Sequence, residues 1–448
     1  MPSPVTQSAT GAPGWSAAAI LIAALAGIPI AAVLWALTAT TNADAWLISL
    51  PAYALNTALL MALVGALSGA IGVGAAWIVT AMAFPGRRLL SWLLVLPLAA
   101  PAYIIAYLYT DLLSFSGPAQ STLRAVFGWG AGDYWFPQIR SLPGAALMLS
   151  LVLYPYVYLL ARAAFAAQSR SQFQAARTLG MSPSRAFFAV VMPGARPAIA
   201  GGLALVLMET LADFGVADYF AIPTFSTGIF RTWLAMGDRL AAMKLAGIMV
   251  LFVILLVGVE ALSRRGSVTS NDRLSAAPPP FTLSPAMAAL AAAACAAPVL
   301  LGFAIPVAGL VVFAATEGDG LSLGVLLGYA RNSVVAGIAA AAIATSLALL
   351  LAYAQRQASS SNVSGMLIKT GVRISTLGYA LPGALLAVGL LGPFASVDRS
   401  VTRFSRAVFD LDHGLLLTGS IALLVYALVI RFLTVSYNSV SGEMAKIS

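Results

Sequence analysis

Long blocks of apolar residues constrain this chain more than any other feature of its sequence. A block of about 20 apolar residues can cross the hydrocarbon core of a bilayer as one α-helix. Hydrophobic residues make up 60% of the 448 residues and charged residues 9%, whereas about 25% of the residues of a soluble domain are charged. Because so few charges cannot cover a water-exposed surface of this size, the sequence predicts an all-α membrane protein, a polytopic bundle of helices.

Ten of these blocks are long and apolar enough to be membrane-spanning helices. The segment before the first block, Met1 to Trp15, contains no Lys or Arg and therefore lacks the basic region of a cleaved signal peptide. We therefore expect the first block to stay in the protein as a spanning helix. The predicted spans lie near residues 16–38, 54–82, 89–112, 143–166, 198–221, 243–263, 287–315, 330–354, 374–396 and 414–436.

The basic residues predict how these spans are oriented. The formal net charge is +9, which in a soluble protein would suggest a nucleic-acid partner. Here the basic residues concentrate on one side of the predicted spans, notably between Arg162 and Arg196, and most acidic residues fall on the other side. Loops rich in Lys and Arg stay in the cytoplasm. We therefore expect a multi-pass protein of the lipid bilayer with a cytoplasmic N-terminus and no nucleic-acid partner.

A polar and then proline-rich segment, residues 266–285, resembles a linker between two halves. Residues 1–265 contain six predicted spans and residues 286–448 contain four. The halves are similar: Asn56 opens the second span and Asn332 opens the eighth, and Pro101 and Pro382 follow in similar apolar sequences. An even number of spans separates these equivalent points, which predicts two parallel repeats, a common transporter plan. Shared apolar composition is the alternative explanation.

The loop at residues 170–195 has the pattern of two short helices with a break between them. Gly180 suits the position that ends the first helix, and Ser182 with Pro183 suits the start of the second. One apolar face at helical spacing is formed by Phe173, Ala176 and Leu179. The pattern predicts a helix across the cytoplasmic ends of the spans that offers small residues to a partner. The alternative is an ordinary amphipathic cytoplasmic helix.

This loop resembles the EAA loop of permease subunits in binding-protein-dependent ABC importers. The family pattern is Glu-Ala-Ala, three residues, Gly, nine residues, Ile, any residue, Leu, Pro. The chain matches the spacing at every position, with Gln for Glu, Val for Ile and Met for Leu. The resemblance implies that the following residues couple the chain to an ATPase subunit: Gln174, Ala175, Ala176, Leu179, Gly180, Val190, Met192 and Pro193.

The resemblance also implies the rest of the assembly. The expected partners are a cytoplasmic ABC ATPase subunit in two copies, which binds ATP and Mg, and a periplasmic solute-binding protein. The expected location is the bacterial inner membrane, and the chain itself is expected to hold no cofactor. The segments 196–215, 219–233 and 379–383 resemble fused, two-repeat ferric-iron permeases, to which thiamine permeases are close. This implies ferric iron as the solute, with thiamine, polyamine and phosphonate as alternatives. Since the family has twelve spans, we interpret the sequence as a truncated chain.

Glu209 and Asp213 are two carboxylates inside a predicted span. Residues four apart share one face of a helix, and a carboxylate in an apolar span is costly unless it faces a polar cavity or a partner. One interpretation is a site on the translocation pathway. The other is a hydrogen bond or ion pair that holds helices together. Three tyrosines near the end of the third span are typical of interfacial anchoring: Tyr103, Tyr107 and Tyr109.

The sequence offers little material for an enzyme. Cys295 and His413 are its one cysteine and one histidine, so we expect no catalytic set of the Ser-His-Asp or Cys-His kind and no metal site of soft ligands. A phosphate-binding Gly-x4-Gly-Lys loop is also missing from the sequence. Two alternatives to an ABC permease remain. One is a secondary transporter driven by an ion gradient through Glu209 and Asp213, and the other is a membrane scaffold or intramembrane enzyme.

Overall fold

The computed structural model of the protein describes residues 12–39, 45–167, 170–263, 281–316, 320, 322–358, 363–411 and 414–444. The chain folds into two compact units. The first unit contains Met1–Trp46, Ile229–Val250 and Asp319–Ser448, and the second contains Leu47–Gly228 and Leu251–Gly318. The boundaries at residues 46–47, 228–229 and 250–251 lie within helices. The division of the chain at a linker, residues 266–285, stays a prediction, and most of that segment lies outside the described residues.

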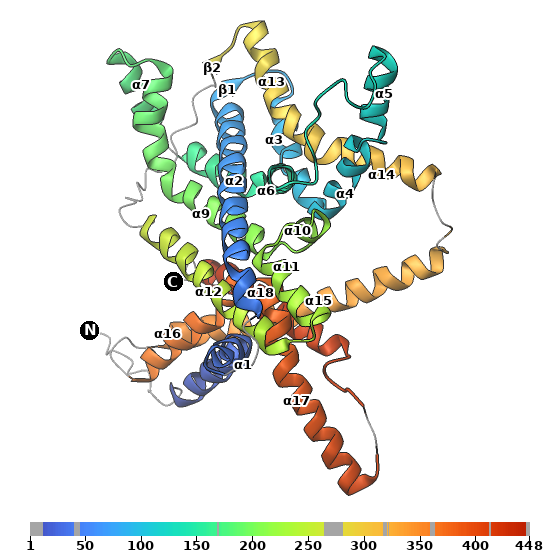
Figure 1. Ribbon diagram of the computed structural model, residues 1–448. Helices are drawn as coiled ribbons and strands as arrows, with labels where there is room; N and C mark the ends of the chain where they lie inside the picture. The colour runs from blue at the N-terminus through green and yellow to red at the C-terminus, as the bar shows by residue number, and fades with distance from the viewer. Residues whose placement is uncertain are drawn as a thin grey trace, which may run out of the picture. The chain divides into compact units, whose positions relative to one another are not determined.

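Helices dominate both units (Figure 1). The first unit contains most or all of α1 (Ala12–Thr38), η4 (Arg231–Ala235), α15 (Leu323–Gln357), α16 (Val363–Ser375), η6 (Gly378–Ala380), α17 (Gly383–Phe409) and α18 (Ile421–Met444). The second contains most or all of α2 (Ala45–Ala81), β1 (Met82–Ala83), α3 (Arg87–Leu93), η2 (Leu96–Ala99), α4 (Ala102–Leu113), α5 (Pro118–Phe127), α6 (Leu142–Ala167), α7 (Arg170–Thr178), α8 (Pro183–Ala186), η3 (Phe187–Val191), α9 (Met192–Ala212), α10 (Gly215–Tyr219), α11 (Phe225–Phe230), β2 (Phe281–Thr282), α13 (Pro285–Val299), η5 (Leu300–Ala304) and α14 (Ile305–Thr316). Helix α12 (Arg239–Ser263) contributes to both units.

The prediction of an all-α polytopic membrane protein is confirmed. Among the described residues, nine helices are long and apolar enough to cross a membrane, or ten if one bent pair counts as a single span. The bent pair replaces the span predicted at residues 89–112, because the chain turns by 92° between Ala99 and Ala102. Pro101 sits at the turn in an extended conformation (φ −62°, ψ 128°) and has no N–H to continue the helix.

The span predicted at residues 198–221 is also wrong in its bounds. The helical segment begins at Phe187 and ends at Ala212. Asp213 leaves the helix with φ −66° and ψ 123°, and its carboxylate oxygen Oδ2 accepts hydrogen bonds from the N–H groups of Val216 and Ala217, both at 3.1 Å. An Asp side chain that caps a new helix in this way competes with continuation of the old one.

The same helix break occurs in both halves of the chain. In the first half, α3 and η2 lead to Pro101 and then α4; in the second half, α16 and η6 lead to Pro382 and then α17. Pro382 has φ −60° and ψ 145°, close to the conformation of Pro101. The two prolines that align in the sequence therefore have similar backbone conformations, and each directly precedes a helix. The division into two parallel repeats stays a prediction.

Each unit combines helices from both halves. In the first unit, α1 crosses α17 so closely that a Cβ atom added to Gly389 would lie 2.7 Å from the carbonyl oxygen of Pro29. In the second unit, the segment from α13 to α14 crosses α4 and α6. There a Cβ atom on Gly302 would lie 2.6 Å from the carbonyl oxygen of Leu151. Glycine at both crossings lets the backbones approach, as is usual for helices packed in a membrane.

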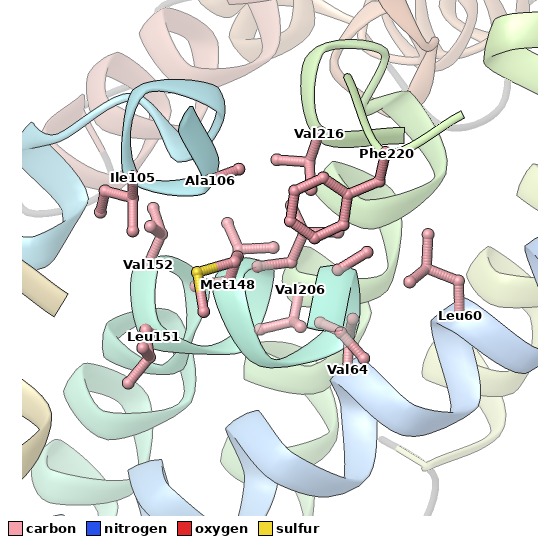
Figure 2. Packing of buried hydrophobic residues seen from close by; sticks show 14 of the residues in the cluster. Leu60, Val64, Ile105, Ala106, Met148, Leu151, Val152, Val206, Val216 and Phe220 are labelled. Atoms are coloured by element: carbon pink, nitrogen blue, oxygen red, sulfur yellow. The ribbon is translucent and has the colours of Figure 1, made fainter. Parts of the chain in front are cut away.

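A buried apolar cluster holds the second unit together (Figure 2). Lipid tails are as apolar as these side chains, so close packing rather than exclusion of water holds such helices together. The interfacial anchoring predicted for the tyrosines of α4 is wrong for Tyr109, which is 6% exposed. The cluster includes Leu60 and Val64 of α2, Ile105 and Ala106 of α4, Met148, Leu151 and Val152 of α6, Val206 of α9, Val216 of α10, and Phe220, which directly follows α10.

Candidate functional site

The loop at residues 170–195 forms two short helices with a break at Gly180, as the sequence predicts. Helix α7 ends in a left-handed residue, Gly180, with φ +85°. The N–H of Met181 donates to the carbonyl of Ala176 at 3.1 Å, and the N–H of Gly180 donates to that of Arg177 at 3.1 Å. This pair of bonds is a Schellman cap, which satisfies the last carbonyls of a helix and favours glycine at the left-handed position.

The second half of the loop begins with a side-chain cap and continues as a π-helical turn. Ser182 Oγ accepts a hydrogen bond from the N–H of Arg185 at 3.3 Å, as predicted for the residue before Pro183. The turn η3 follows, and the N–H of Met192 closes it by donating to the carbonyl of Phe187. Pro193 has no N–H to donate, so the regular bonding pattern is interrupted where the motif places its proline.

The apolar face predicted for α7 is divided in the structure. Phe173 (7% exposed) and Ala176 (5% exposed) are buried in the second unit, whereas Leu179 is 82% exposed. The reason is that Leu179 follows the last helical residue and lies at the turn, beyond the part of α7 that packs on the bundle. Ala175 and Gly180 are also exposed. The surface open to a partner is therefore the tip formed by Ala175, Leu179 and Gly180, and it does not include Ala176.

The remaining motif residues lie near the bundle rather than at the tip. Val190, Met192 and Pro193 are half-buried where η3 joins α9. The side chain of Gln174 lies outside the described residues.

Trp77 of α2 is the residue of this site that the sequence analysis missed. Its ring lies 5.8 Å from the ring of Phe173 in α7, 4.6 Å from that of Phe187 in η3 and 5.7 Å from that of Phe165 in α6. These are centroid distances typical of favourable aromatic pairs. Nothing in the local sequence of α2 distinguishes Trp77 from other apolar residues of a span; the contact becomes visible once the loop folds back onto the bundle.

Glu209 and Asp213 do not lie on one continuous helix, because α9 ends at Ala212. Asp213 caps α10 through Oδ2, and both carboxylates are half-buried. Hydroxyl groups bind other backbone groups near this break: Ser226 Oγ donates to the carbonyl of Leu211 at 2.7 Å, and Thr57 Oγ1 accepts from the N–H of Phe225 at 3.0 Å. The assignment of the two carboxylates to a translocation pathway stays a prediction.

Comparison with known proteins gives the family of this region. Residues 68–265 match the family described as binding-protein-dependent transport system inner membrane component. We call residues 68–265 the permease domain after this likeness, which covers less than half of the chain. The match includes both halves of the loop, the cap at Gly180, Trp77 and the break at Asp213.

Three relatives show how far the likeness extends. The molybdenum transport system permease protein ModB of Haemophilus influenzae is 30% identical over 150 residues, which are 34% of this chain and 62% of that protein. The sulfate transport system permease protein CysT of Salmonella typhimurium is 28% identical over 203 residues, 43% of this chain and 69% of that protein. The Fe(3+)-transport system permease protein FbpB 2 of Haemophilus influenzae is 26% identical over 206 residues, which are 45% of this chain and 36% of that protein.

The relatives share the permease domain but differ in the solute that their names give. Their names call them permease proteins of transport systems, not enzymes. Within the part of the chain that the structure describes, there is no group of three or more His, Cys, Asp or Glu side chains that could hold a metal ion.

Proposed function

We propose that this chain is the membrane-spanning subunit of an ATP-driven importer in the bacterial inner membrane. A periplasmic binding protein delivers the solute, and a separate cytoplasmic ATPase, in two copies, binds ATP and Mg. The observation that carries the proposal is the exposed tip of the permease domain's loop. A leucine that is 82% exposed, near Ala175 and followed by a left-handed glycine, is a small apolar surface. It has the form of a knob that enters a groove on another protein.

The proposed orientation places α7 and the N-terminus in the cytoplasm. Helix α6 is a candidate span from Leu142 to Ala167, so α7 and the segment before Leu142 lie on opposite sides of the membrane. The cluster of arginines from Arg162 to Arg196 then lies on the cytoplasmic side, as the distribution of basic residues in membrane proteins favours. The segment around α5 lies on the periplasmic side, where a binding protein docks.

The solute that we propose is ferric iron. The segments 196–215 and 219–233 carry the likeness to ferric-iron permeases, and the alignment with the Fe(3+) permease protein extends over 206 residues. Relatives named for molybdenum, sulfate and 2-aminoethylphosphonate make these the competing solutes. Uptake of radioactive ferric iron, molybdate and sulfate into proteoliposomes containing the complete complex tests the choice. Uptake of molybdate or sulfate without uptake of iron would overturn it.

Copurification tests the central proposal. The tagged chain is solubilised in detergent, and the proteins that bind to it are identified by mass spectrometry. We expect a P-loop ATPase with the parent chain and at least about a tenfold depletion with Leu179→Glu, since a buried apolar contact would be replaced by a charge. Leu234→Glu is the matched control, because Leu234 is 70% exposed and lies outside the loop.

Two results contradict the proposal. One is the absence of any P-loop ATPase from the parent preparation. The other is full retention of the ATPase by Leu179→Glu. Either result would make an ion-coupled secondary transporter the leading hypothesis. Ala176→Asp is unsuitable as a docking variant, because Ala176 is buried inside the permease domain and a charge there would disturb its folding.

A further inference from the structure

We infer that Trp77 is the joint that transmits movement of α7 to the membrane helices of the permease domain. The inference rests on the proposed function, since it concerns how a force on the docking tip enters the bundle. The relevant contacts are the three ring pairs of Trp77, with Phe173 of α7, Phe187 of η3 and Phe165 of α6. Trp77 thus connects the loop on both sides of the Gly180 turn to two membrane helices, α2 and α6.

The first step of the transmission is a rigid connection from the tip to Trp77. Leu179 is exposed at the tip, while Phe173 and Ala176, on the same short helix, are buried against the bundle. The Schellman cap closes the turn that contains Leu179, through hydrogen bonds from the N–H groups of Gly180 and Met181 to the carbonyls of Arg177 and Ala176. A helix closed in this way moves as one piece, so a displacement of Leu179 must displace the ring of Phe173 against Trp77.

The second step leads from Trp77 into α9. The ring of Phe187 is the nearest of the three, with its centroid at 4.6 Å, and Phe187 opens the π-helical turn η3. Such turns are rare, and they often occur at functional sites. Helix α9 follows directly and has 21 residues, a length of about 30 Å at 1.5 Å per residue. Helix α9 ends at the break at Asp213. Trp77 therefore contacts both α7 and the turn at the start of α9, the helix whose other end is at this break.

A purely structural role for Trp77 makes a different prediction from a transmitting role. A residue that merely fills space affects the stability of the whole permease domain. A residue that transmits movement affects how strongly binding at one site changes another site. Such coupling commonly changes an affinity by a factor of about 5 to 150. Spatial proximity alone does not establish such a path. The experiment must therefore measure coupling separately from folding and from attachment of the ATPase.

The experiment uses the full-length chain, with the ATPase that copurifies and its binding protein, reconstituted in lipid nanodiscs. The measured quantity is the increase in ATP hydrolysis when the loaded binding protein is added. Trp77→Ala is expected to keep the ATPase attached and to reduce this stimulation by about tenfold, within the usual range of coupling. Trp77→Phe, which keeps an aromatic ring, is expected to restore most of it. Trp92→Ala is the matched control, since Trp92 is 74% exposed on α3.

A second readout follows the loop itself. Cys295 is the one cysteine of the chain, so a Cys295→Ser background allows a spin label at Leu179→Cys. Without partners, Trp77→Ala is expected to increase the mobility of this label, and Trp77→Phe and Trp92→Ala are expected to leave it near the parent value. Phe173→Ala should have the same effect as Trp77→Ala, and the two together should add little to either alone.

The outcomes separate this inference from the proposed function. If no ATPase copurifies with the parent chain, the proposed function fails, and the inference fails with it. If the ATPase copurifies and Trp77→Ala behaves like Trp92→Ala in both readouts, the inference alone is overturned. It is also overturned if Trp77→Ala lowers attachment, stability and stimulation together and Trp77→Phe rescues none of them, because that is the behaviour of a residue that only supports folding.

Discussion

The hydroxyl group of Tyr109 donates a 2.7 Å hydrogen bond to the carbonyl oxygen of Leu301, across 192 residues of sequence. Leu301 lies in the π-helical turn η5, where each carbonyl accepts from the N–H five residues later. For Leu301 that residue is Pro306, which has no N–H. The tyrosine therefore supplies the donor that the proline removes. An apolar environment makes such an unpaired carbonyl costly, so the bond fixes α4 against the segment from α13 to α14.

Removing this hydroxyl should destabilise the second unit. Tyr109→Phe is expected to lower the free energy of unfolding by about 0.6–1.5 kcal/mol, the range for a single hydrogen bond in a protein or membrane interior. Thermal unfolding in detergent, followed by the loss of soluble protein, measures the change. Tyr107→Phe is the control, since Tyr107 is 49% exposed; an equal shift for the two variants would contradict the role given to Tyr109.

A second tyrosine has the same relation to a proline in the first unit. Tyr426 Oη donates to the carbonyl of Leu25 at 2.6 Å, and the helical donor to that carbonyl would be the N–H of residue 29, a proline. Pro29→Ala restores the N–H, so Tyr426→Phe should cost less in the Pro29→Ala background than in the parent. A double-mutant cycle of unfolding free energies tests this. Additive effects would show that the hydroxyl does not compensate for the proline.

The left-handed conformation of Gly180 should make this position specific for glycine. A Cβ atom at Gly180 meets no atom within 4 Å, so the cost of Gly180→Ala is conformational and amounts to about 1–2 kcal/mol. We expect the cap to open more often, so that the amide hydrogen of Met181 exchanges faster. Each loss of 1.4 kcal/mol in the stability of the cap should raise the exchange rate about tenfold. Gly180→Asn should exchange more slowly than Gly180→Ala, because asparagine tolerates this conformation better. Hydrogen exchange followed by mass spectrometry measures both, and the reverse order would refute the explanation.

Asp398 of α17 should be essential to the loop that precedes α18. It is 1% exposed, and its carboxylate accepts from the N–H groups of Leu417 and Thr418 at 2.9 Å and from Thr418 Oγ1 at 2.7 Å. Asp398→Asn turns an amide N–H group toward these donors, which should cost about 1–3 kcal/mol. Asp410→Asn is the exposed control. If thermal unfolding is shifted equally by both variants, Asp398 does not hold this loop.

The features that depend only on neighbouring residues in the chain were predictable from the sequence. The cap at Gly180 and the helix start at Ser182 depend on neighbouring backbone groups, and both are confirmed. The exposure of Leu179 beside the burial of Ala176 depends on where α7 meets the bundle, which periodicity does not reveal. The end of α9 at Asp213 was missed because hydropathy does not register a side chain that bonds its own backbone. The burial of Tyr109 depends on a helix 192 residues later.

The mixing of helices from both halves has a consequence for how the protein is made. Synthesis proceeds from the N-terminus, so α1 enters the membrane long before α16, α17 and α18 exist. Its bond from Tyr426 to Leu25 joins residues 401 positions apart. Until Tyr426 has been synthesised, the carbonyl of Leu25 in α1 lacks this donor. Assembly of the first unit therefore waits for α15, α16, α17 and α18.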